Sequence, residues 1–150
     1  MIKTRIIGIN LAAANDVRIG EIAGALLAHA VAAYPTETFY ALGAAAFSRK
    51  AVDRIYLLKK RDASKPLSVI ASDLDMVREI STSPSPSFMA LAAEFWPGPL
   101  TLVLPAAAGV PEFLLGPGRT IAVRIPPLAW LRALAVRIPP LAWLRALARE

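Results

Sequence analysis

Cysteine is absent from this sequence of 150 residues, and histidine occurs once, at position 29. The lack of thiols excludes disulfide bonds, a thiolate nucleophile and cysteine-based zinc sites. A Ser-His-Asp triad or a histidine metal site would have to use His29, which lies in the apolar run from Ala25 to Ala33 and is predicted to be a packed helix residue. Triad hydrolases and histidine-based metal sites are therefore nearly excluded, and no metal ligands are predicted.

Long apolar runs are also absent. The longest weakly polar run, from Ile22 to Tyr34, is well short of the ~20 residues that a membrane-spanning helix needs. The N-terminus has too short an apolar stretch for a secretory signal and lacks a small-residue cleavage site, so we expect a cytoplasmic protein without membrane contact. The length suits one domain with a single core, and the net charge of +6 favours anionic partners without choosing among nucleotide, RNA and lipid headgroups.

Hydrophobic patterning predicts alternating strands and helices in one α/β (α+β) domain. Strands are expected at residues 5–10, 31–34, 67–71, 100–104 and 120–125. Helices are expected at residues 16–30, 48–59, 73–80 and 88–96, and from the Pro126-Pro127 pair to residue 134. The segment from Ser81 to Ser87 is predicted to be a loop that Pro84 and Pro86 keep non-helical.

The last part of the chain repeats itself without an intervening residue. Residues 122–134 read AVRIPPLAWLRAL, and residues 135–147 repeat them unchanged. A solenoid would show longer and more varied repeats, so we interpret the pair as a recent tandem duplication, a sequence-assembly error or a cloning accident. Because the second copy follows a helix directly, Ala135 to Ile138 is predicted to extend that helix until Pro139-Pro140 breaks it. Identical residues would then adopt different structures.

Four segments carry the most distinctive residue combinations: YPTETFYALG (34–43), KKRDASKPL (59–67), FWPGPLTLVLP (95–105) and GRTIAVRIP (118–126). In order and spacing they resemble the threonylcarbamoyl-AMP synthase, or YrdC-like, family, and the resemblance covers about residues 19–134. Enzymes of this family join L-threonine, bicarbonate and ATP into threonylcarbamoyl-adenylate and release pyrophosphate. A partner machinery then transfers the threonylcarbamoyl group to adenosine 37 of tRNA.

The resemblance implies a nucleotidyltransferase built on a twisted mixed sheet that is flanked by helices and has a basic concave face. ATP is then a substrate, and Mg²⁺ is expected with it. Family members continue into a Ser-x-Asn motif that contacts the threonine and the nucleotide, and this sequence does not contain that continuation. We therefore expect an incomplete YrdC-like domain at residues 1–134 and a duplicated, mainly helical segment at residues 135–150.

Basic residues between a predicted helix and a predicted strand are the first candidate site residues. Long cationic side chains on such a loop can converge on a polyphosphate. By resemblance Arg61 contacts ATP, Lys65 contacts the nucleotide, and Lys59 completes a Lys-x-Arg motif, so Lys59 and Arg61 are the candidate catalytic pair. The alternative is that these charges only cap the helix C-terminus in solvent.

The remaining candidates lie on or after strands. By resemblance Thr38 binds L-threonine, Arg124 clamps its carboxylate, and Thr120 contacts ATP from the same strand face as Arg124. The alternatives are turn capping for the Pro-Thr-Glu-Thr segment and a solvent-facing arginine on an edge strand. The family has glycine where Ala41 stands, so the backbone there is expected to be slightly shifted, and Arg137, the duplicate of Arg124, is expected to have no role.

The segment FWPGPLT is predicted to be architectural, with Phe95 and Trp96 in the core and Pro97-Gly98-Pro99 fixing a turn. The enzyme hypothesis requires Arg61 and Arg124 to face one cationic pocket. Two other hypotheses remain, a non-catalytic module that binds double-stranded RNA or tRNA and an inactive fragment of the synthase.

Overall fold

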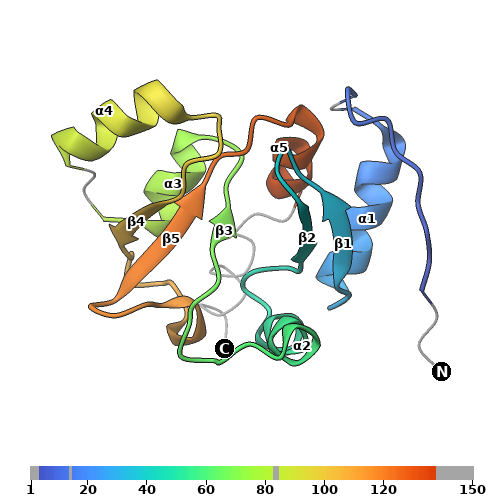
Figure 1. Ribbon diagram of the computed structural model, residues 1–150, viewed down its shortest axis with the longest axis horizontal. Coiled ribbons are helices and arrows are strands. Elements are labelled where there is room, and N and C mark those ends of the chain that lie inside the picture. Colours follow the sequence, from blue (N-terminus) through green and yellow to red (C-terminus); the bar gives the residue numbers. More distant parts are fainter. Residues whose placement is uncertain (1–3, 14, 83–84, 138–150) are drawn as a thin grey trace.

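Two small β-sheets form the framework of the described part of the chain, which is residues 4–13, 15–82 and 85–137 of the computed structural model (Figure 1). The first sheet is an antiparallel hairpin of β1 (Ala32–Pro35) and β2 (Tyr40–Gly43). The second has the order β3-β5-β4, in which β5 (Thr120–Arg124) runs parallel to β3 (Val69–Ile70) and antiparallel to β4 (Leu102–Pro105). The predicted α/β class with a mixed sheet is confirmed, but the strands divide into two sheets.

Helices flank both sheets. They are α1 (Val17–Leu27), α2 (Arg49–Lys59), α3 (Leu74–Ile80), α4 (Pro86–Phe95), the 3-10 helix η1 (Glu112–Leu114) and α5 (Ala129–Val136). Helix α1 lies on the side of the hairpin that faces away from the mixed sheet (Figure 1). In the same view α3 overlaps the mixed sheet, and α4 lies at the upper left of that sheet. Helices α5 and α2 lie above and below the region between the two sheets in this view.

Short polar side chains begin the helices where the sequence predicts. The side chains of Asp16, Ser48 and Asp73 each accept a hydrogen bond from a backbone N–H in the first turn of α1, α2 and α3. The predicted start of α4 at Phe88 is wrong, because α4 begins at Pro86 after the cap Ser85. Proline is well suited to the first helical position, where its missing N–H is not needed.

Helix α1 ends at Leu27, three residues before the predicted end. Its last turn closes with hydrogen bonds from His29 N to Leu26 O and from Ala30 N to Ala25 O, each 3.0 Å long. His29 takes the left-handed position of this motif with φ of 64°. The prediction that His29 is a packed helix residue is therefore wrong; it is half-buried after the helix, and its Nδ1 lies 2.6 Å from the Ser48 hydroxyl.

Two further predictions about strands need correction. Residues 5–10 form no strand, and Ile6 is 94% exposed, because this weakly alternating segment has no strand partner among the described residues. Instead the Asn10 N–H donates a hydrogen bond to Asp16 Oδ2 (3.1 Å), at the start of α1. Strand β2 has no counterpart among the predicted strands, because four residues between a polar turn and an alanine-rich segment give little local signal.

Buried apolar residues form two clusters. The larger one packs α2, α3 and α4 against the mixed sheet and includes Val52, Val77, Ile80, Leu104 and Val123. Each such fully buried side chain contributes about 1.5–3 kcal/mol relative to an exposed one.

The smaller cluster joins α1 to α5, with Ile19, Leu26 and Leu131 packed around Trp130. The ring of Tyr34 on β1 meets Trp130 edge to face, with centroids 6.1 Å apart, so this cluster also supports the hairpin.

The two copies of the duplicated sequence differ in structure over the residues that can be compared. Ala122 and Val123 lie in the middle of β5, whereas the equivalent Ala135 and Val136 form the last turn of α5. The predicted extension of the helix into the second copy is confirmed as far as Val136. The helix ends there, with Arg137 as its C-cap, so it stops before the predicted end at residue 138. Residue 138 itself and the second proline pair lie outside the described residues.

The close contact between Gly43 and Tyr34 gives a stability prediction. A Cβ on Gly43 would lie 2.4 Å from Tyr34 Cε1, so Gly43→Ala displaces the ring from Trp130. We expect a loss of about 1–3 kcal/mol in the free energy of unfolding, measured by urea denaturation. Gly24→Ala is the matched control, because nothing lies within 4 Å of its Cβ position in α1, and there we expect a gain of up to about 1 kcal/mol. Equal stability of the Gly43→Ala variant and the wild type would contradict this packing.

Candidate functional site

A cavity of about 350 Å³ lies between the hairpin and the mixed sheet. Its walls come from β1, β2 and the turn between them, from α2, from β3 and the residues before it, and from α5. The volume is within the range of pockets that hold small ligands. Three of the predicted site residues line it, namely Thr38, Lys59 and Arg124.

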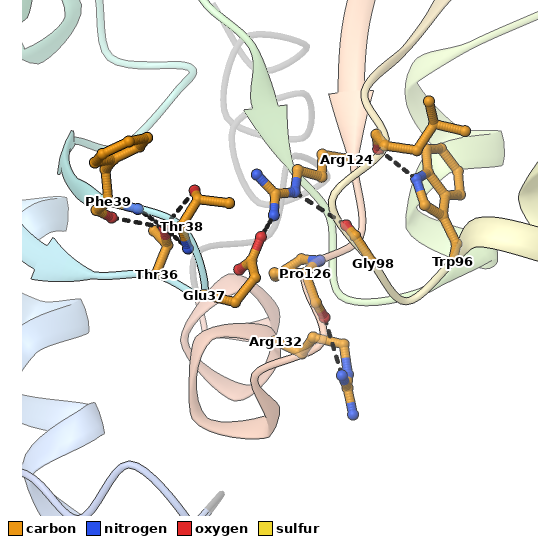
Figure 2. A network of polar contacts seen from close by, with 10 residues as sticks. Thr36, Glu37, Thr38, Phe39, Trp96, Gly98, Arg124, Pro126 and Arg132 are labelled. Carbon is orange, nitrogen blue, oxygen red and sulfur yellow. Dashed lines mark hydrogen bonds and ion pairs between the residues drawn. The ribbon is translucent and has the colours of Figure 1, made fainter.

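Arg124 is the last residue of β5 and the best-anchored cation of the cavity (Figure 2). Its Nε donates to the Gly98 carbonyl oxygen at 3.0 Å, and its Nη2 forms an ion pair with Glu37 Oε1. The side chains of Arg124 and Glu37 are only 19% and 20% exposed. Burial lowers the pKa of the Arg124 guanidinium, because removal from water disfavours the charged form. The predicted alternative of a solvent-facing arginine is therefore wrong.

The turn at Pro97-Gly98-Pro99 holds the carbonyl that fixes Arg124. The Gly98 N–H donates to Ile125 O at 2.9 Å, so the turn is tied to the end of β5 on both sides of Gly98. Gly98 is buried, and a Cβ there would lie 2.1 Å from the Phe95 carbonyl oxygen, which leaves no room for a side chain. The motif is thus architectural, and it also positions a site residue.

The aromatic residues of the same motif differ in their surroundings. Trp96 packs edge to face on Phe88 and donates its Nε1–H to Leu100 O at 2.6 Å, as expected of a core residue. Phe95 is 48% exposed, so its prediction as a core residue is wrong. Phe95 is the last residue of α4.

The hairpin turn from Thr36 to Phe39 supplies the polar wall opposite Arg124 (Figure 2). Thr36 Oγ1 accepts from the N–H groups of Thr38 and Phe39 at 3.2 Å each and donates to the Phe39 carbonyl at 2.6 Å. Thr36 therefore performs the turn capping that was the alternative for this segment. Glu37 and Thr38 project from the capped turn and line the cavity.

The basic loop after α2 is divided between the cavity and its surroundings. Lys59, the last residue of α2, lines the cavity, but Arg61 and Lys65 are exposed and do not. The Arg61 guanidinium donates hydrogen bonds to two backbone carbonyls of its own loop. Its Nε donates to Lys65 O at 3.0 Å, and its Nη2 donates to Pro66 O at 3.2 Å. The next residues along the chain, 67 and 68, are again part of the cavity wall. A single pocket that includes both Arg61 and Arg124 thus stays a prediction.

Thr120 lies near this loop rather than near Arg124. The alternating burial along β5 places both residues on one face, as predicted, but at opposite ends of the strand. The Thr120 hydroxyl donates to Pro117 O at 2.9 Å, and a Cβ on Gly116 would meet both Thr120 Oγ1 (3.1 Å) and Pro66 Cγ (3.3 Å). The predicted ATP residues Arg61, Lys65 and Thr120 therefore gather around Pro66 and Gly116, outside the cavity lining.

Two cavity residues that interact with Arg124 were not among the predicted site residues. Glu37, the partner of Arg124, stands within the motif that supplied Thr38, but the pairing joins residues 87 positions apart and leaves no local signal. Tyr34 lines the cavity from β1, and burial raises the pKa of its phenol while the nearby Arg124 cation opposes that shift. Arg137 lies at the end of α5, exposed and outside the cavity lining.

Across residues 4–13, 15–82 and 85–137, His, Asp and Glu form no cluster of three or more that could hold a metal ion. Within the same residues, no helix has the length and apolar character needed to cross a bilayer.

Comparison with known proteins identifies relatives of similar sequence. The Sua5/YciO/YrdC family model, described as "Telomere recombination", matches residues 24–146. A threonylcarbamoyl-AMP synthase of Pyrococcus abyssi is 40% identical over 112 residues, which is 75% of this chain and 33% of the relative. A Bacillus subtilis protein of the same name is 40% identical over 119 residues, 77% of this chain and 34% of the relative. The chain thus spans about a third of the length of these relatives.

A solved structure gives the same picture in three dimensions. The crystal structure of P. abyssi Sua5 complexed with L-threonine superposes with a TM-score of 0.75 at 36% identity. The match covers 81% of this chain and 36% of the Sua5 chain. The similarity therefore extends from the sequence motifs to the arrangement of the strands and helices.

The backbone at Lys60 gives a prediction for the basic loop. Lys60 has φ of 47° and ψ of 39° and closes α2 through its N–H bond to Leu57 O. Glycine adopts this left-handed conformation without the steric cost that a side chain brings, so Lys60→Gly is expected to raise the free energy of unfolding by about 0.5–1 kcal/mol. Chemical denaturation measures the change. Lys50→Gly, in the right-handed backbone of the same helix, is the control and is expected to lower it by up to about 1 kcal/mol. A Lys60→Gly variant less stable than the wild type would contradict the assigned conformation.

Proposed function

Because the chain belongs to the Sua5/YciO/YrdC family, we propose that it carries the substrate-binding region of an L-threonylcarbamoyladenylate synthase. In this reaction L-threonine, bicarbonate and ATP give threonylcarbamoyl-AMP, pyrophosphate and water. The observation that carries the proposal is the largely buried Arg124 guanidinium, which lines a cavity of about 350 Å³ together with the side chains of Thr36 and Thr38. The assignment of the relatives as threonylcarbamoyl-AMP synthases and the L-threonine bound to P. abyssi Sua5 support the same proposal.

The amino-acid end of the site is assigned to the cavity. Arg124 is proposed to bind the carboxylate of L-threonine, because a guanidinium presents parallel N–H donors that match a carboxylate. Thr38, which lines the cavity opposite Arg124, is proposed to contact the amino acid through its hydroxyl. The fixed position of Arg124, held by Gly98, lowers the cost of ordering the site when the ligand binds.

The nucleotide end is assigned to the basic loop and the start of β5. Attack of a threonine carbamate on the α-phosphorus of ATP brings two anions together, so catalysis requires positive charge and exact alignment of the reactants. Arg61, Lys65 and Thr120 are proposed to hold ATP, and Lys59 reaches the cavity wall between the two ends. Arg61 would exchange its bonds to the Lys65 and Pro66 carbonyls for phosphate oxygens, which are stronger acceptors for a cation.

Further partners follow from the proposed reaction. Mg²⁺ is proposed to arrive on the phosphate oxygens of ATP, which are its usual ligands in such sites, rather than on a protein cage. The adenylate product would pass to a machinery that modifies tRNA, in the cytoplasm. The net charge of +6 favours contact with tRNA or double-stranded RNA but does not select it over nucleotides.

A coupled assay for pyrophosphate tests the proposed function. We expect release of pyrophosphate from ATP that depends on both L-threonine and bicarbonate. Arg61→Ala is expected to lower kcat/KM by about tenfold to a hundredfold, which corresponds to the loss of one hydrogen-bonded charge contact. Arg78→Ala is the control, since Arg78 only forms an exposed ion pair with Asp75 on α3.

Other outcomes of the assay would point to the alternatives. No pyrophosphate release together with salt-sensitive RNA binding that survives Arg61→Ala and Arg124→Ala would support the binding module instead. Affinity for ATP no better than millimolar, with a low and broad melting transition, would indicate an inactive fragment.

A further inference from the structure

Glu37 is the one acidic side chain among the described residues that line the cavity. It forms an ion pair with Arg124, the residue to which the proposed function assigns the substrate carboxylate. Both side chains are about four-fifths buried. One guanidinium therefore has two carboxylates to accommodate, one from the protein and one from the ligand.

Burial decides what happens to Glu37 when the ligand arrives. A charge that is largely removed from water is costly unless a partner of opposite sign is close. If the ligand carboxylate takes over part of the Arg124 guanidinium, Glu37 loses part of its compensation. An α-amino acid carries an ammonium group on the carbon next to its carboxylate, so it brings the missing positive charge within reach of Glu37.

The surrounding contacts allow this exchange with little movement. The Arg124 Nε–H is bound to Gly98 O at 3.0 Å, so the guanidinium stays in place. Glu37 stands on a hairpin turn whose backbone is held by the Thr36 hydroxyl. The Glu37 carboxylate and the Arg124 guanidinium meet end to end, so a rotation of the Glu37 side chain would separate the pair without moving the turn (Figure 2).

We propose that Glu37 and Arg124 together form a receptor for zwitterionic α-amino acids, in which Glu37 binds the ammonium group and thereby determines specificity. The inference rests on the proposed function of the cavity as an amino-acid site. In the empty site the two residues neutralise each other, and in the occupied site each binds the opposite end of the ligand. The charges of Glu37 and Arg124 are thus compensated in both states, and a carboxylic acid without an amine is selected against.

Ligand analogues separate the two ends of this receptor. L-Threonine carries both charges, whereas 2,3-dihydroxybutanoate keeps the carboxylate and replaces the ammonium with a hydroxyl. Ligand-observed NMR titration of the full chain gives the dissociation constant of each compound and hence their ratio. Because both constants come from the same sample, the ratio does not depend on the fraction of folded protein.

We expect the wild type to bind L-threonine about tenfold to a hundredfold more tightly than 2,3-dihydroxybutanoate, as is usual for a buried charged hydrogen bond. In Glu37→Gln this preference is expected to fall to about threefold or less, because the amide has no charge to offer the ammonium. Glu37→Asp keeps the charge and is expected to retain part of the preference. Glu21→Gln is the matched control, because Glu21 lies on α1 and forms an exposed ion pair with Arg5. This variant is expected to retain the full preference for L-threonine.

Two results would overturn the inference alone. The first is a wild-type preference that survives in Glu37→Gln. The second is tighter binding of both compounds by Glu37→Gln at an unchanged ratio, which would make Glu37 only a competitor for Arg124. A wild-type chain that binds no L-threonine at millimolar concentration would overturn the proposed amino-acid site together with this inference.

Discussion

A guanidinium taken largely out of water at the end of β5 is the constraint around which this site is built. Arg124 retains 19% exposure and needs compensation for its charge and for its N–H donors. The compensation comes from two segments that are remote in sequence, the carbonyl of Gly98 before β4 and the carboxylate of Glu37 in the hairpin turn. A single side chain thus links the mixed sheet to the hairpin, and the cavity lies at that link.

The two ends of the proposed site differ in character because different local structures form them. The amino-acid end is enclosed by the hairpin, β3 and α5, and its polar groups are held by hydrogen bonds. The nucleotide end is an exposed loop that follows a left-handed residue, Lys60, and its Arg61 donates hydrogen bonds to backbone carbonyls of the same loop. An enclosed pocket suits selection of a small zwitterion, and an exposed cationic loop suits a large polyphosphate whose own charge contributes most of the attraction.

The duplicated sequence shows how far tertiary context overrides local preference. Ala122 and Val123 are strand residues because β3 and β4 pair with β5 on both sides. The same two residue types at 135 and 136 form the last turn of α5, because the preceding helical turn already offers carbonyl acceptors to their N–H groups. Helix extension adds one hydrogen bond for each residue fixed, whereas a strand needs a partner from elsewhere in the chain.

The sequence by itself determined the features that depend on neighbouring residues. Helix starts at Asp16, Ser48 and Asp73 follow from caps within three residues of the N–H groups they bind, and the family motifs are contiguous strings whose residue types identify Thr38 and Arg124 as site candidates. Only the tertiary structure decided that Glu37 pairs with Arg124, that Gly98 anchors it, and that Arg61, Lys65 and Thr120 lie apart from the cavity lining. The physical reason is that a charge pair or a cavity wall is formed by residues distant along the chain, and no local pattern of hydrophobicity or capping records which distant segments meet.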